Sequence, residues 1–88
     1  MIERQVTILN RAGIHARPAS LIVQTANQFE SQVYLDKDGT RINAKSIMGI
    51  ITLGAAYKSE LTLSADGPDE AEVIDAISHL FDSRFEED

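Results

Sequence analysis

The chemistry of this chain is predicted to centre on one histidine, His15, in the segment NRAGIHARPA over residues 10–19. Gly13 permits a tight loop before it, and Pro18 suits the first turn of a helix, where no backbone N–H is needed. The imidazole is therefore expected at or just before a helix N-terminus, close to the guanidinium of Arg17. Free backbone N–H groups and the positive end of the helix dipole point to the same place, which suits an anion. We interpret His15 as a residue that accepts and passes on a phosphoryl group.

A histidine in this position also has an ordinary explanation, because a loop histidine beside a helix start is usually exposed or caps a backbone group. Arg17, Pro18 and the two small residues beside them favour the chemical interpretation, since they leave the imidazole accessible next to a cation. The other histidine, His79, falls opposite Ile77 on the last predicted helix and is interpreted as a surface residue.

Length and composition limit what the chain can be. Its 88 residues predict a single domain, over residues 1–88, with a thin core and no sizeable internal ligand cavity. No cysteine is present and the two histidines lie far apart, so neither a metal site nor a cofactor is expected. The formal net charge of −6 disfavours nucleic-acid binding. No signal peptide or membrane-spanning stretch is recognisable, so a cytoplasmic protein is the expectation.

The spacing of apolar residues predicts the element order βαββαβα. Alternation indicates strands near residues 2–8, 33–35, 40–44 and 61–65, and helical spacing indicates helices over 19–29, 47–53 and 73–81. Arg4 falls on the apolar face of the first strand and is expected at a sheet edge. Asp69 and Glu72 resemble a capping box at the start of the last helix. One sheet covered on one side by helices is implied, with the strand order left open.

A second candidate site follows the third strand. Ser46 is predicted to cap a helix of about two turns, and Ile50 and Leu53 are expected to enter the core. The remaining apolar side chains cannot all be buried on so short a helix. They predict an exposed docking patch formed by Ile47, Met48 and Ile51.

Two motifs give the chain its resemblance to a known family. The segments GIHARPA (13–19) and KSIMG (45–49) resemble HPr, the histidine-containing phosphocarrier of the bacterial phosphoenolpyruvate-dependent sugar phosphotransferase system. The resemblance runs from about residue 2 to residue 81, and residues 82–88 form an acidic extension that is expected to fray. It implies an α+β fold, the HPr-like open-faced sandwich, with a four-stranded antiparallel sheet and three helices on one face.

The resemblance also implies roles for individual residues. His15 would accept a phosphoryl group on Nδ1 from phospho-Enzyme I and pass it to IIA domains of sugar permeases, and Arg17 would contact the phosphate. Ser46 would be the residue phosphorylated by HPr kinase/phosphorylase. The partner-docking face would comprise Ala16, Ser20, Gln24, Asn27, Ile47, Met48 and Ile51. Such a protein would be a stoichiometric carrier rather than an enzyme, and a monomer.

Three alternatives stay open. The first is a phosphoprotein of the nitrogen-related branch, NPr, without a part in sugar transport. Residues 10–13 resemble that branch, and Ala12 stands where many relatives have a hydroxyl residue. A second hypothesis is a regulatory protein that acts through phosphorylated Ser46, by binding a transcriptional regulator or a transporter. A third is a small ligand-binding module of ferredoxin-like type, although no residue identifies a ligand.

Overall fold

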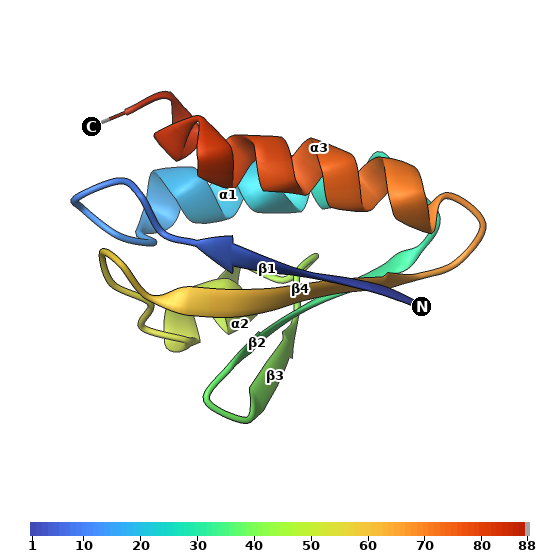
Figure 1. The fold of residues 1–88 in the computed structure, drawn as a ribbon, viewed down its shortest axis with the longest axis horizontal. Coiled ribbons are helices and arrows are strands. Elements are labelled where there is room, and N and C mark those ends of the chain that lie inside the picture. Colours follow the sequence, from blue (N-terminus) through green and yellow to red (C-terminus); the bar gives the residue numbers. More distant parts are fainter. Residues whose placement is uncertain (88) are drawn as a thin grey trace.

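The computed structural model describes residues 1–87, in which helices cover a four-stranded sheet (Figure 1). The strands are β1 (Ile2–Thr7), β2 (Gln32–Lys37), β3 (Thr40–Asn43) and β4 (Glu60–Asp66). The helices are α1 (Ala16–Ala26), α2 (Ile47–Thr52) and α3 (Glu70–Asp82), followed by a short 3-10 turn, η1 (Arg84–Glu86). Within residues 1–87, no helix is both long enough and apolar enough to cross a membrane.

The sheet is antiparallel throughout, with the strand order β1-β4-β2-β3. Ala65 in β4 faces Ile2 of β1 on one side and Val33 of β2 on the other. β1 and β3 are therefore the edges. Arg4 lies on an edge strand as predicted, and its guanidinium contacts the carboxylate of Asp75 in α3 at 3.0 Å.

The core lies between the sheet and the helices, and α1 and α3 lie side by side over it (Figure 1). α2 packs against α1 and β3. The largest fully buried side chains come from both layers and include Ile22, Leu35, Leu61, Leu63, Ile74, Ile77 and Phe81. Burying each such side chain stabilises the fold by about 1.5–3 kcal/mol. The predicted open-faced sandwich, with three helices on one face of the sheet, is confirmed.

The short helix α2 has the predicted two faces. Ser46 Oγ accepts a hydrogen bond from the N–H of Gly49 at 3.1 Å, which caps the helix start. Ile50 is 1% exposed and Leu53 is 9% exposed, so these two enter the core. Met48, by contrast, is 70% exposed. The prediction that α2 leaves apolar side chains on the surface is confirmed.

The predicted capping box at the start of α3 is wrong. Asp69 is the N-cap residue but makes no side-chain hydrogen bond to its own helix. Its carboxylate instead accepts from the N–H groups of Glu30 and Ser31, each at 2.9 Å. Glu70, rather than Glu72, reaches back and accepts from the N–H of Gly67 at 3.1 Å. The Asp69 carboxylate cannot cap α3 because it already accepts hydrogen bonds from the segment that follows α1, which is remote in sequence.

The expectation of a frayed extension over 82–88 is also wrong for its described part, residues 82–87. Phe85 is fully buried and packs edge-on against Phe81, with ring centroids 5.0 Å apart. Burial of this aromatic ring stabilises an ordered end to the chain, because removing a large apolar side chain from water lowers the free energy of the folded state. Asp88 lies outside the described residues.

Candidate functional site

His15 is the N-cap residue of α1, with extended backbone angles (φ −116°, ψ −165°). Its carbonyl accepts the N–H of Ala19 at 3.0 Å. The preceding loop is held by the buried side chain of Asn10, whose Nδ2 donates to the carbonyl of Gly13 at 2.7 Å. Gly13 has a φ of +73°, and a Cβ there would lie 2.9 Å from the carbonyl oxygen of Ala55. Glycine alone suits this position, and it sets the path of the chain toward His15.

The first turn of α1 leaves backbone donors open beside the imidazole. Within the described chain, no side chain caps this turn and no acidic residue lies in it. Pro18 has no N–H. The N–H groups of Ala16 and Arg17 lie too early in the helix to have a carbonyl partner within it. The side chains of His15 and Arg17 are 44% and 52% exposed. The structure therefore places His15 as predicted, at an open helix start and accessible to a partner.

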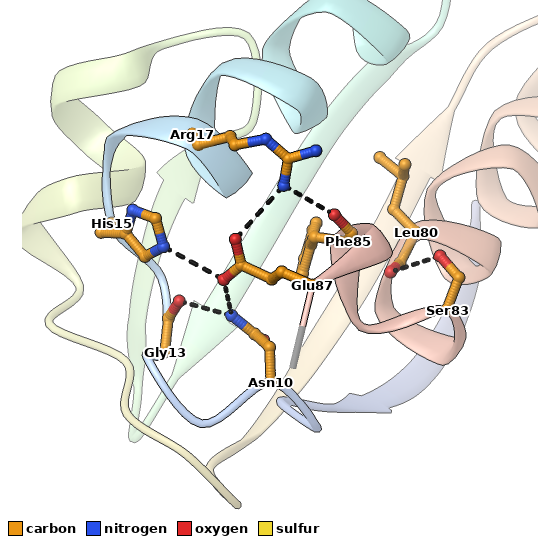
Figure 2. Close-up of polar contacts among 8 residues, drawn as sticks. All are labelled: Asn10, Gly13, His15, Arg17, Leu80, Ser83, Phe85 and Glu87. Atoms are coloured by element: carbon orange, nitrogen blue, oxygen red, sulfur yellow. Dashed lines mark hydrogen bonds and ion pairs between the residues drawn. The ribbon is translucent and has the colours of Figure 1, made fainter.

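A carboxylate from the far end of the chain lies between these two side chains (Figure 2). Oε1 of Glu87 lies 3.1 Å from Nε2 of His15, and Oε2 accepts from Nη1 of Arg17 at 3.2 Å. Asn10 Nδ2 also donates to Oε1, at 3.0 Å. The hydrogen bonds from His15 and then Asn10 hold the pKa of Glu87 below its ordinary value of 4.5. The Glu87 carboxylate therefore occupies the space between the imidazole and the guanidinium.

The two ring nitrogens of His15 have different surroundings. Nε2 contacts Glu87, whereas Nδ1 has no hydrogen-bond partner among residues 1–87. In Figure 2 the second nitrogen lies on the side of the ring that faces away from Glu87. Nδ1 is thus the nitrogen open to an incoming group.

The residues predicted for partner docking come from two helices that pack together, α1 and α2. On α1, Ala16 and Gln24 are exposed and Ser20 is half-buried, and Asn27, the C-cap residue that follows the helix, is exposed. On α2, Ile47 and Ile51 are 42% and 39% exposed, beside Met48. The predicted docking residues are accessible as a group.

Ser46 is not part of the network around His15. It lies at the start of α2, is half-buried, and has Gly49 rather than His15 or Arg17 as its hydrogen-bond partner in the described structure. The two candidate modification sites are therefore separate.

Reasoning from the sequence missed two residues of the site, Asn10 and Glu87. Asn10 preceded the histidine closely but was not distinguished from an ordinary loop residue. Glu87 lies 72 positions from His15. The sequence offers Phe85, an aromatic residue within an acidic end, as a sign of a buried side chain, but it does not indicate that this end lies beside His15.

Comparison with known proteins places the chain among phosphocarriers. A family model described as the phosphorylation site of the PTS HPr component matches residues 2–83. The phosphocarrier protein HPr of Treponema pallidum is 51% identical over 88 residues, which covers 100% of both chains. The crystal structure of HPr-C-His from Thermoanaerobacter tengcongensis has a TM-score of 0.96 at 49% identity, covering 100% of this chain and 99% of that one.

A relative of a second kind is the HPr-like protein Crh of Bacillus subtilis. It is 45% identical over 78 residues, which covers 89% of this chain and 92% of Crh. A crystal structure of Crh has a TM-score of 0.77 at 42% identity and covers 96% of this chain and 97% of that one. It is described as a catabolite repression protein that forms a dimer with a swapped domain. The relatives thus include regulatory variants as well as carriers.

Proposed function

The chain belongs to the HPr family, and on that premise we propose that it is a phosphocarrier in which His15 accepts the phosphoryl group of phospho-Enzyme I. His15 then passes the group to IIA domains of sugar permeases. The observation that carries the proposal is the half-exposed imidazole of His15 at the uncapped start of α1, with the Arg17 guanidinium beside it.

The strength of the site suits a group that is accepted and then released. A helix N-terminus stabilises an exposed anion by about 0.3–1 kcal/mol. Arg17 adds a charge-assisted hydrogen bond, which its exposure to water weakens. Neither contact would trap the phosphoryl group. Each partner would supply further charges around the phosphorus in the transition state.

Phosphorylation by Enzyme I and phosphoenolpyruvate tests the proposal. The wild-type protein should gain one acid-labile phosphate, and His15→Ala should gain none. His79→Ala is the matched control, because it removes the other histidine from the exposed side of α3 and should be labelled normally. Labelling of the His15→Ala variant would refute the assignment.

The docking face of this carrier is proposed to be formed by Ala16, Ser20, Gln24, Asn27, Ile47, Met48 and Ile51. Six of these residues are exposed and Ser20 is half-buried, and they lie along α1 and α2, two helices that pack together, which supports that assignment. Exposed apolar side chains that gather on one surface are typical of protein-binding sites.

Regulation through Ser46 by HPr kinase/phosphorylase is a second candidate function. Ser46 caps α2 immediately before Ile47 and Met48, so a phosphate there would bring about −1.5 to −2 charges to the edge of the apolar docking surface. The similarity to Crh, a protein described by its part in catabolite repression, supports this interpretation.

Phosphorylation by HPr kinase and ATP tests the second candidate. Ser46→Ala should abolish incorporation, whereas Thr52→Ala, which removes another hydroxyl from the same helix, should leave it unchanged. Equal incorporation into Ser46→Ala and the wild type would exclude Ser46 as the modified residue.

A further inference from the structure

We propose that Glu87 is a positioning residue for His15: its carboxylate holds the ring proton on Nε2 and so leaves the lone pair of Nδ1 free to attack phosphorus. This inference rests on the proposed function, because it concerns how His15 becomes the nucleophile. It adds a residue from the C-terminal end of the chain to the site at the start of α1.

The direction of the hydrogen bond between His15 and Glu87 follows from the chemistry of the two groups. An ionised carboxylate has no proton to give, so Nε2 must be the donor across the 3.1 Å contact. A glutamate carboxyl group with its ordinary pKa of 4.5 is already ionised at neutral pH, and the hydrogen bonds from His15 and Asn10 lower the pKa of Glu87 further. A neutral imidazole carries one ring proton, and a proton held on Nε2 leaves Nδ1 with its lone pair.

The carboxylate is itself held in place by two other side chains. Asn10 is fully buried, and its Nδ2 donates both to the carbonyl of Gly13 at 2.7 Å and to Oε1 of Glu87 at 3.0 Å. Arg17 donates to Oε2 at 3.2 Å. Both oxygens are therefore bound, and the Glu87 side chain is only 22% exposed. A group fixed in this way can orient an imidazole, which a freely rotating surface glutamate cannot.

The backbone conformation of residues 84–86 places the Glu87 carboxylate beside His15. Arg84, Phe85 and Glu86 have φ values of +57°, +53° and +59°, a run in the left-handed region that residues with a Cβ seldom adopt. Such a run persists only where other contacts determine it. Here the buried ring of Phe85 against Phe81 and the hydrogen bond from Arg17 to the Phe85 carbonyl, at 2.9 Å, do so.

The same contact assists the transfer step. The Nδ1 lone pair forms a bond to phosphorus while the bond between phosphorus and the donor breaks, and the donor leaves with that electron pair. The proton on Nε2 stays where it is throughout, so the ring of His15 gains positive charge as the new bond forms. The carboxylate at Nε2 stabilises that charge, in the way that a buried aspartate stabilises an imidazolium in a serine protease.

The test compares Glu87→Ala with Glu86→Ala, a control that removes the same charge one residue earlier from an exposed position. Nitrogen NMR of the labelled His15 ring at alkaline pH reads the position of the proton. The rate of phosphoryl uptake from phospho-Enzyme I is measured on the same samples. We expect the Nε2–H form to dominate in the wild type and in Glu86→Ala. In Glu87→Ala the ring should shift toward the mixture of Nε2–H and Nδ1–H forms found in a free imidazole. Phosphoryl uptake should then be roughly threefold to tenfold slower.

Two results would overturn the inference. An unchanged ring spectrum with an unchanged rate would mean that Glu87 merely rests against His15. Faster uptake in Glu87→Ala would mean that the carboxylate blocks the incoming phosphate. Failure of the wild-type protein itself to take phosphate on His15 would instead refute the proposed function, and the ring spectrum would still report on the contact.

Discussion

At the scale of single residues, the site depends on what surrounds the two nitrogens of one imidazole. A histidine at a helix start has two ring nitrogens that could bind phosphorus, and its neighbours decide which one carries the proton. Glu87 is the neighbour that contacts Nε2, and Asn10 and Arg17 hold its two oxygens. Under the proposed function, this arrangement would leave Nδ1 as the reactive nitrogen while the ring stays exposed.

The acid sensitivity of this network is the first prediction. The pKa of Glu87 is lowered, first by the hydrogen bond from His15, so the ionised form is stabilised by folding. Its contribution to the free energy of unfolding is fully present above the ordinary value of 4.5 and is lost as pH falls through the lowered folded-state value. The difference in that free energy between the wild type and Glu87→Gln should therefore shrink below this value. Denaturant unfolding across the range measures it, and a constant difference would contradict the network.

How far the sequence could predict the site depended on distance along the chain. His15 and Arg17 were predictable because Gly13 and Pro18 act locally, through the left-handed φ of one and the missing N–H of the other. Glu87 was not predictable because its contact depends on the tertiary packing of Phe85. The predicted capping box at Asp69 was wrong for the same reason, because the Asp69 carboxylate binds the backbone of Glu30 and Ser31 rather than its own helix.

At the scale of elements, the loop before α1 is the part that aims the imidazole. Gly13 is buried, and a Cβ at this position would meet the Ala55 carbonyl. Gly54 also has a positive φ, of +61°, but the space around it is open. A comparison of alanine substitutions at Gly13 and Gly54 therefore distinguishes the cost of backbone strain from the cost of a steric clash.

The second prediction compares alanine at these two glycines. Gly54→Ala should cost about 1 kcal/mol of stability, from the left-handed backbone alone. Gly13→Ala should cost at least about 2 kcal/mol, because strain and overlap add, and it should also slow phosphoryl uptake by moving His15. Urea unfolding and the uptake rate measure both effects. Equal costs at the two positions would show that the contact with Ala55 does not constrain the loop.

The third prediction uses the two faces of α2. Met48→Ala should change the free energy of unfolding by less than about 0.5 kcal/mol, since the side chain is 70% exposed. Ile50→Ala should cost about 2–5 kcal/mol, since that side chain is buried. In phosphoryl transfer from Enzyme I, Met48→Ala should raise KM severalfold with little change in kcat. An unaltered KM would remove Met48 from the docking face.

At the scale of the whole molecule, helix packing brings the C-terminal end of the described chain to the start of α1, whereas the N-terminus lies on the opposite side (Figure 1). α3 packs against β1 and β4, and α1 packs against α3, so the turn after α3 ends beside the start of α1. The element order was predictable from periodicity, because each segment shows its own spacing. The strand order β1-β4-β2-β3 was not, because pairing between strands remote in sequence depends on how the helices cross the sheet.

The fourth prediction concerns oligomeric state. We expect a monomer, because a carrier that visits several partners needs its docking face free. Light scattering after size-exclusion chromatography should give a mass close to 9.7 kDa. A mass of twice that value would instead place the chain with its relative Crh, whose crystal structure is described as a swapped dimer.

The central claim is tested most directly by locating the phosphorus on the phosphorylated protein. After incubation with Enzyme I and phosphoenolpyruvate, isotope-labelled protein is examined by NMR for coupling between phosphorus and the ring nitrogens of His15. The structure predicts phosphorus bonded to Nδ1, with the proton retained on Nε2 beside Glu87. Phosphorus on Nε2, on His79 or on a side chain other than histidine would contradict it.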